Sequence, residues 1–282
     1  MTETLPAAAY ESADALPEDV RQPLRDLILA LADSKRVLGL RYSDRMLGSP
    51  TLEAGIAASS MAQDEWGHAR LTYALLGDLG DDPKALEHER GAAEYRSISA
   101  LDADLRGWSG MIAAALLVDM ALTAQYAALV DSRYAPVRNR VQKLLDEEKF
   151  HFQYAAGWAR QISQGPELRG ELAAELARVL PQALRWLGRD DAPGMERLVQ
   201  EGIVRDQPSA RRARFLARVG PVLEEIGAAE QLGVTRDGAE WTYTGALDWS
   251  GWDDATRRAG GSLDEETAAR ARGDKNRALL MD

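Results

Sequence analysis

The residues Glu65-Trp66-Gly67-His68 and Glu148-Lys149-Phe150-His151 give the same Glu-x-x-His pattern twice in one chain. An i, i+3 spacing places the carboxylate and the imidazole on one face of a helix, about one turn apart. A helical bundle that brings two such pairs together can hold two metal ions in its core. The two motifs therefore predict a helical bundle with a buried metal centre.

Hydrophobic periodicity predicts four long amphipathic helices around these motifs, at about residues 17–47, 51–76, 108–134 and 136–163. Residues 77–107 form a long connection that is expected to contain short helices. Two helical hairpins joined by a long crossover are typical of ferritin-like bundles, and each motif falls on the second helix of its hairpin. The predicted fold class is therefore all-α, with a ferritin-like four-helix bundle.

The rest of the chain predicts a helical extension. Shorter helices interrupted by prolines are expected between residues 167 and 227, a small hairpin at 240–249, and a final charged helix at 264–281. We expect an N-terminal tail (1–16), the bundle (17–164), and an extension packed on it (165–282).

A ferritin-like site also needs a carboxylate from the first helix of each hairpin. Asp119 fits in the second hairpin, because it is the only acidic residue in the apolar stretch 111–129 and precedes Glu148 by 29 residues. An unpaired carboxylate there would cost several kcal/mol, and a nearby cation would relieve that cost. Counting back 29 residues from Glu65 reaches Lys35 and Arg36, so the expected carboxylate of the first hairpin is missing.

The predicted metal ligands are thus Glu65, His68, Asp119, Glu148 and His151, with Lys35 and Tyr42 acting beside them from the inward stripe of the first helix. Carboxylates and imidazoles around open positions suit iron, and also manganese. We expect two iron ions, or one if Lys35 blocks a position. Asp64 and Glu147 precede the motif glutamates and either orient the histidines or form exposed salt bridges.

Composition narrows the function. The net charge of -11 argues against a nucleic-acid partner, and the absence of cysteine excludes thiolate chemistry. No apolar run of 18 residues and no secretory signal are visible, so we expect a cytoplasmic protein without a membrane span. One basic cluster is either a solvated helix face or a seat for an anionic substrate tail or a partner subunit: Arg205, Arg211, Arg212, Arg214 and Arg218.

Residues 62–68, 117–119 and 147–151, with 49–52 and 247–249, resemble the phenylacetic acid catabolic family, and within it the catalytic alpha subunits of phenylacetyl-CoA epoxidases. The likeness runs from about residue 20 to residue 282. It implies a di-iron oxygenase that adds one oxygen atom to the ring of an aromatic acyl-CoA, together with a structural partner subunit and a reductase. At the position of Lys35 the family has a glutamate ligand.

Lysine has no acceptor when protonated, and its charge repels a divalent cation. If Lys35 points inward, it replaces a metal, becomes a deprotonated or carboxylated ligand, or leaves one site formed by Asp119, Glu148 and His151. If it points outward, Asp33 or another carboxylate replaces it. The sequence therefore favours an altered-metal monooxygenase component acting on an acyl-CoA. The rivals are a metal-poor structural subunit that docks a catalytic homologue, and a metal store or oxidant scavenger. Either a homologous subunit or a homo-oligomer is expected.

Overall fold

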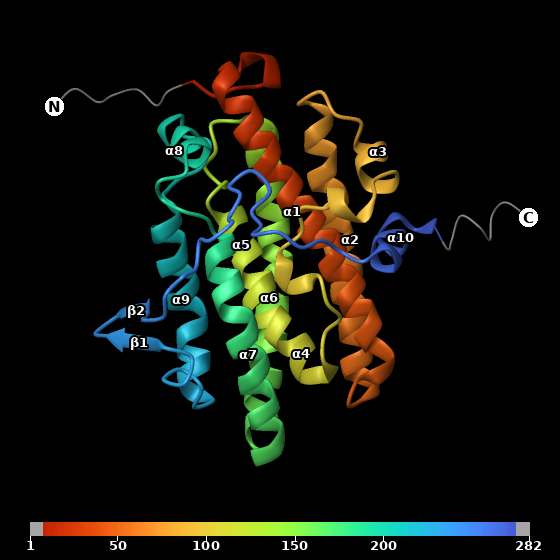
Figure 1. Ribbon diagram of the computed structural model, residues 1–282, viewed down its shortest axis with the longest axis vertical. Coiled ribbons are helices and arrows are strands. Elements are labelled where there is room, and N and C mark those ends of the chain that lie inside the picture. The colour runs from red at the N-terminus through yellow and green to blue at the C-terminus, as the bar shows by residue number, and fades with distance from the viewer. Residues whose placement is uncertain (1–7, 275–282) are drawn as a thin grey trace, which may run out of the picture.

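The computed structural model describes residues 8–274 and has the predicted all-α, ferritin-like architecture. Four long helical segments lie side by side: α1 (Glu18–Arg45), α2 (Leu52–Gly77), the continuous run of α4 (Gly107–Ala113), η5 (Ala114–Asp119) and α5 (Met120–Ala127), and α6 (Ala135–Ser163) (Figure 1). Their apolar faces meet in one core, which is where a ferritin-like site is expected.

The first hairpin, α1 and α2, begins and ends within two residues of the predicted bounds. A short 3-10 turn, η2 (Met46–Gly48), ends α1, and the Thr51 hydroxyl caps α2 by accepting from Ala54 N at 3.2 Å. Gly39 lets the two helices approach closely, because a Cβ at this position would lie 2.7 Å from Trp66 Cδ1.

The crossover between the hairpins contains short helices, as predicted: α3 (Pro83–His88), η3 (Ala92–Glu94) and η4 (Ser99–Leu101). It is fixed to the first hairpin by buried ion pairing rather than by apolar contacts alone. Arg90 binds both carboxylate oxygens of Asp33, and Asp33 also accepts from the Tyr73 hydroxyl at 2.5 Å.

The third helix differs from the prediction at its end. It was expected to reach residue 134, but α5 ends at Ala127. The backbone beyond it is paired elsewhere: Arg133 N donates to Gly202 O at 2.9 Å, and Tyr10 N donates to Arg133 O at 2.7 Å. Contacts with distant segments therefore override a local pattern that favoured helix.

The helical run Gly107–Ala127 is long and apolar enough to cross a membrane by length and composition. Protein buries 83% of its most apolar stretch. The run is therefore accounted for as the core helix of the bundle, surrounded by α1, α6 and α7 (Pro166–Trp186).

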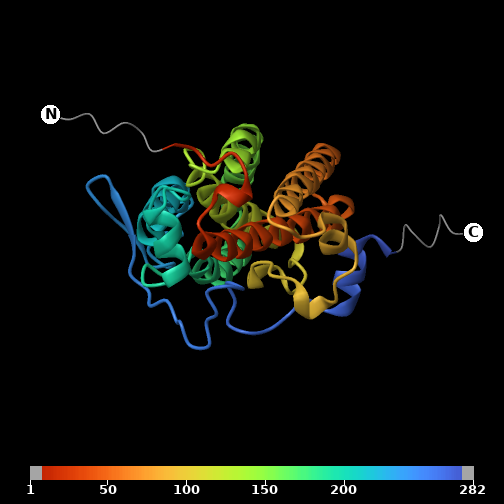
Figure 2. The same cartoon turned by 90° about the horizontal axis from the view of Figure 1, so that it is seen from above.

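The C-terminal part adds α7, α8 (Pro193–Gln200), α9 (Pro208–Glu225), the antiparallel strands β1 (Val234–Asp237) and β2 (Glu240–Tyr243), and α10 (Glu265–Arg272). Helices α7 and α9 pack against α5 and α6. Figures 1 and 2 show α9 and the hairpin on one side of the bundle and α10 on the other, with the intervening chain running across it. The proposed boundary at residues 164 and 165 stays a prediction.

Two predicted bounds are corrected here. The hairpin lies at 234–243 rather than 240–249, because β1 carries a single buried side chain, Val234, and gives no alternating pattern. The final helix ends at Arg272, where Gly273 adopts a left-handed φ of 80° and terminates it. Residues 275–281 of that prediction lie outside the described residues.

Candidate functional site

A fully buried lysine lies at the centre of the bundle. Lys35 Nζ is 2.6 Å from Asp119 Oδ1, 2.5 Å from Glu148 Oε1 and 2.9 Å from Glu65 Oε2. The four side chains come from α1, α2, η5 and α6, and each is at most 2% exposed. The predicted inward orientation of Lys35 is what the structure has, so the outward alternative is wrong.

Local structure explains how each side chain reaches this point. Lys35 shares the inward face of α1 with Leu31 and Leu38, both fully buried. Asp119 is the last residue of the π-helical segment η5, and such single turns occur frequently at functional sites. The carboxylate is thereby presented to the core from a helix that is otherwise apolar.

The two histidines reach across to the opposite helix. His68 Nδ1 on α2 is 3.1 Å from Glu148 Oε1 on α6, and His151 Nδ1 is 3.2 Å from Glu65 Oε1. His151 Nδ1 also lies 3.0 Å from Asp119 Oδ2. The ring centroids are 6.4 Å apart, and both rings are buried, so the imidazoles meet at one centre.

The outer nitrogens of the same rings are held by the acidic residues that precede the motif glutamates. His68 Nε2 is 2.7 Å from Glu147 Oε2, and His151 Nε2 is 3.2 Å from Asp64 Oδ2. Here too each carboxylate contacts the histidine of the other helix. Of the two predicted roles for Asp64 and Glu147, the contact with the histidines is therefore the one observed.

The contacts follow an internal repeat of the sequence. Glu65 and Glu148 are 83 positions apart, as are His68 and His151, while Lys35 and Asp119 are 84 apart. Lys35 therefore occupies in the first hairpin the place that a carboxylate occupies in the second.

Charge in this cluster is balanced internally. Burial opposes the charge on Lys35, but the surrounding carboxylates outweigh it and hold the pKa of the lysine well above its usual value. Burial also opposes ionisation of Asp119, but the ammonium and His151 keep its pKa well below the usual range. Burial and the charge of Asp119 raise the pKa of Glu65 to about 7.

The histidine pKa values move in the same sense. Burial disfavours protonation of both rings, but hydrogen bonds to Glu148 at His68, and to Asp119, Asp64 and Glu65 at His151, raise their pKa values. With both rings protonated, three cations face the three buried carboxylates of Glu65, Asp119 and Glu148.

Two hydroxyl groups complete the carboxylate contacts. Tyr42 is fully buried and donates to Asp119 Oδ2 at 3.2 Å, and burial together with the charge of Asp119 raises its pKa well above the usual value. Thr123 donates to Glu148 Oε2 at 3.1 Å. Sequence reasoning missed Thr123, although its position one turn after Asp119 was a usable signal.

Comparison with known proteins adds the family. A family model described as phenylacetic acid catabolic protein matches residues 1–255. This chain belongs to that family. The prediction made from the motif segments is thereby confirmed, and membership supports a role in phenylacetate catabolism.

One similar member of the family is a subunit of the 1,2-phenylacetyl-CoA epoxidase of Escherichia coli (strain K12). It is 26% identical over 194 residues, which cover 68% of this chain and 77% of that protein. The more specific likeness to the catalytic alpha subunit stays a prediction.

The residue types in the cluster are those of a metal site. Ligand atoms of Glu65, Asp119, Glu148 and His151 all lie within 4.8 Å of one another and are buried, so this group could hold a metal ion. His68, the fifth predicted ligand, lies outside that group but contacts Glu148.

The arrangement of these atoms, however, does not fit a metal. The Lys35 ammonium lies where three carboxylates converge and takes up their oxygens, and it offers no lone pair to a cation. Asp33, the alternative ligand, is not available, because Arg90, Tyr73 and the backbone N–H of Arg96 occupy its carboxylate.

The arginine cluster is dispersed rather than gathered into one seat. Arg211 is fully buried, Arg214 pairs with Asp206, and the Arg218 guanidinium lies 3.8 Å from the centroid of the Phe152 ring. Arg205 and Arg214 have side chains that are about two-fifths exposed. The expected uniform solvated face is therefore not what the structure has.

Proposed function

We propose that this chain is a structural subunit of a phenylacetyl-CoA epoxidase-type oxygenase complex, and that the Lys35 ammonium replaces the metal charge in its bundle. The observation that carries this proposal is the distance of Lys35 Nζ from three buried carboxylates, 2.5–2.9 Å. The proposal keeps the predicted homologous ferritin-like partner and assigns the reductase and the aromatic acyl-CoA to that partner.

The energetics support this assignment. Three carboxylates in a dry core repel one another and lose their hydration, which costs several kcal/mol for each ion after relaxation. A metal ion offsets that cost in a catalytic homologue. In this chain a covalently attached cation does so permanently, and the bundle is stable without a metal supply.

Similarity supports the partner. The similar Escherichia coli protein is named as one subunit of an epoxidase, which implies an assembly of several subunits. A bundle that keeps the ferritin-like shape but carries no metal serves to hold a homologous bundle in its active conformation.

Co-purification tests the proposal. This chain is co-expressed with a tagged metal-binding homologue of the same family, and the complex is analysed for iron in each of its chains. We expect a stable complex whose iron is accounted for by the tagged homologue alone. The proposal is overturned if the two chains do not associate, or if this chain purified alone carries stoichiometric iron or manganese.

A second candidate is an altered-metal monooxygenase, which the retention of five ligand-type side chains favours. In this candidate Lys35 leaves the centre, and Glu65, His68, Asp119, Glu148 and His151 hold iron or manganese. The metal would supply the activation of dioxygen, while Tyr42 would donate its hydrogen bond to Asp119. Incubation of the iron-loaded chain with reductant and phenylacetyl-CoA decides between the candidates, because only this one expects an oxygenated acyl-CoA.

Lys35→Glu links the two candidates. The substitution removes the ammonium and restores the carboxylate that the resemblance places there. We expect the variant to bind iron while the wild-type chain does not, with Lys149→Glu, an exposed lysine of α6, as the control. Cytoplasmic location remains a prediction that fractionation of expressing cells tests.

A further inference from the structure

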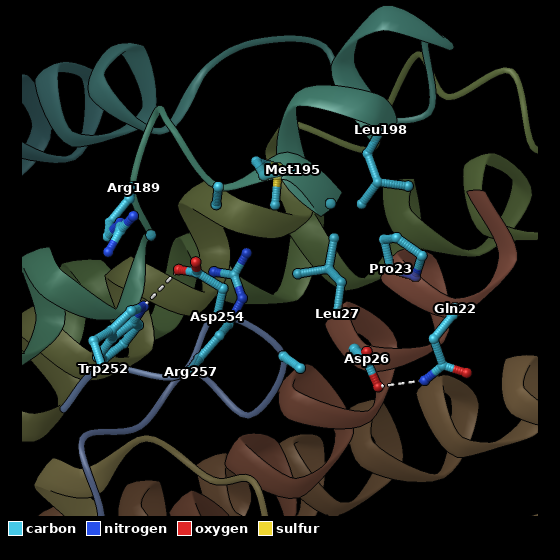
Figure 3. A pocket seen from close by; sticks show the side chains of 14 residues that line it. Gln22, Pro23, Asp26, Leu27, Arg189, Met195, Leu198, Trp252, Asp254 and Arg257 are labelled. Atoms are coloured by element: carbon cyan, nitrogen blue, oxygen red, sulfur yellow. Dashed lines mark hydrogen bonds between the residues drawn. The ribbon is translucent and has the colours of Figure 1, made fainter. Parts of the chain in front are cut away.

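Residues 252–257, which lie in the chain that runs across the bundle, line a cavity together with α1 and the first turn of α8 (Figure 3). Its volume is about 200 Å³, and Pro23, Leu27, Met195 and Leu198 give it a largely apolar lining. Leu27 and Lys35 are eight residues apart on α1, or about 12 Å along the helix, so the cavity is separate from the lysine centre.

A buried cation lines this cavity without a counter-ion. Arg257 is 6% exposed, its Nη1 donates to Trp186 O at 2.7 Å, and its guanidinium lies over the Trp186 ring. Figure 3 shows the side chain rising into the cavity. Within residues 8–274, no carboxylate oxygen comes within 4.0 Å of its nitrogens. Burying an uncompensated charge costs several kcal/mol, and an anion in the cavity would recover that cost.

The backbone at Arg257 is also unusual. Its φ of 55° is the only positive value at a non-glycine residue in the described chain. A left-handed conformation costs such a residue about 1–2 kcal/mol and tends to persist at ligand sites.

The other charged groups around the cavity are accounted for. Asp26 accepts from Gln22 and Arg96, and Arg189 makes a two-pronged ion pair with Asp191. Asp254 is exposed at the rim and accepts from Trp252 Nε1 at 2.8 Å. Arg257 is therefore the lining charge that lacks a partner.

The neighbourhood of Arg257 adds positive rather than negative charge. Arg211 is fully buried and lies near enough for Arg257 to lower its pKa, after the larger effect of its burial. Arg211 Nε and Nη2 have no hydrogen-bond partner among the described residues.

The first turn of α8 provides further donors. Ala192 gives the helix no side-chain cap, and among the described residues no oxygen accepts from the backbone N–H of Gly194 or Met195. Both residues line the cavity. A helix N-terminus with free N–H groups favours an anion, here in agreement with the guanidinium opposite.

We propose that this cavity is a binding site for a small organic monocarboxylate with a short apolar body. The carboxylate pairs with Arg257 and the free N–H groups of α8, and the body fills the apolar space. A cavity of about 150 Å³ holds a benzene ring, so this one accommodates a single ring or a chain of similar size. Asp254 at the rim disfavours ligands with a second negative charge.

Titration of the full chain with benzoate and with benzamide, followed by ligand-observed NMR, tests the site. The two probes have the same shape and differ in charge. We expect saturable binding of benzoate that is about tenfold or more tighter than that of benzamide. Arg257→Gln is expected to reduce the preference to about twofold or less, because the neutral side chain removes the ion pair.

Two further variants keep the test decisive if Arg257→Gln does not fold. Leu27→Trp fills the apolar part of the cavity and is expected to abolish binding of both probes. Arg189→Gln changes the lining arginine that is already paired, and it is expected to leave the preference for benzoate unchanged. Absence of saturable benzoate binding to the wild-type chain overturns the proposal, as does benzoate binding that survives both Arg257→Gln and Leu27→Trp.

Discussion

At the scale of single residues, one ammonium determines the electrostatics of the core. Lys35 contacts Glu65, Asp119 and Glu148, and these carboxylates in turn contact both histidines. Removing the cation would therefore leave several buried charges uncompensated at once.

Lys35→Met is expected to lower the free energy of unfolding by about 3–5 kcal/mol at pH 7.5, because it leaves buried carboxylates without their cation. Chemical denaturation followed by circular dichroism measures the loss. Lys149→Met is the matched control, since Lys149 forms an exposed pair with Asp146 and is expected to cost less than about 1 kcal/mol.

The same variant carries a pH prediction. In the variant the buried carboxyl groups have raised pKa values, so between about pH 4 and those values the native state binds more protons than the unfolded state. Its stability therefore falls as pH rises through that window. The gap between wild-type and variant is expected to widen from pH 5 to pH 8, and a constant gap would argue against the carboxylates as the cause.

The sequence identified most of the site at this scale. Two matching motifs and one acid in an apolar helix gave Glu65, His68, Asp119, Glu148 and His151, and the helical stripe gave the direction of Lys35. It did not give the crossing of the contacts between α2 and α6, because pairing between helices depends on how they pack. It also missed Thr123, whose hydroxyl is unremarkable in sequence.

At the scale of elements, the approach of α1 to α2 depends on Gly39. A methyl group there would lie 2.7 Å from Trp66 Cδ1 and 3.0 Å from Ala62 O. Lys35 lies one turn before Gly39, so separating the helices would also loosen the lysine contacts.

Gly39→Ala is expected to destabilise the chain by about 1–3 kcal/mol through overpacking. Gly67→Ala is the control on the facing helix, where a Cβ meets nothing within 4 Å and the gain in helix propensity is expected to stabilise by about 0.5–1 kcal/mol. Thermal unfolding of both variants shows whether the signs differ, and a stabilising effect at Gly39 would contradict the close packing.

Element boundaries were predictable where the chain carries its own stop signal. Thr51 begins α2, and Gly165 with Pro166 separates α6 from α7. The end of α5 and the π turn of η5 were not predictable, because the first depends on Gly202 and Tyr10 and the second leaves the apolar pattern unchanged.

At the scale of the whole molecule, ion pairs join segments that are distant in sequence. Arg90 of the crossover binds Asp33 of α1, and Arg258 binds Asp102. These contacts fix the crossover and the C-terminal chain on the bundle, which no local pattern in the sequence predicts.

Arg90→Met is expected to cost about 3–5 kcal/mol, because Asp33 is fully buried and would lose its charge partner. Arg45→Met removes an ion pair with the largely exposed Asp104 and is expected to cost less than about 1 kcal/mol. Equal losses in denaturant titrations of the two variants would show that burial is not what gives the Asp33 pair its importance.

Removal of metal gives a prediction for the intact chain. Since the Lys35 ammonium already balances the core, dialysis against a chelator is expected to leave the melting temperature unchanged, and added ferrous iron is expected to have no stabilising effect. Lys35→Glu serves as the contrast, because its melting temperature is expected to rise with added iron.

The most direct test is a crystal structure of the wild-type chain grown with ferrous iron, with anomalous scattering recorded at the iron edge. We predict no anomalous peak among Glu65, Asp119, Glu148 and His151, with Lys35 Nζ density between the three carboxylates. An iron peak at that position, with Lys35 turned away, would contradict the claim that the ammonium replaces the metal.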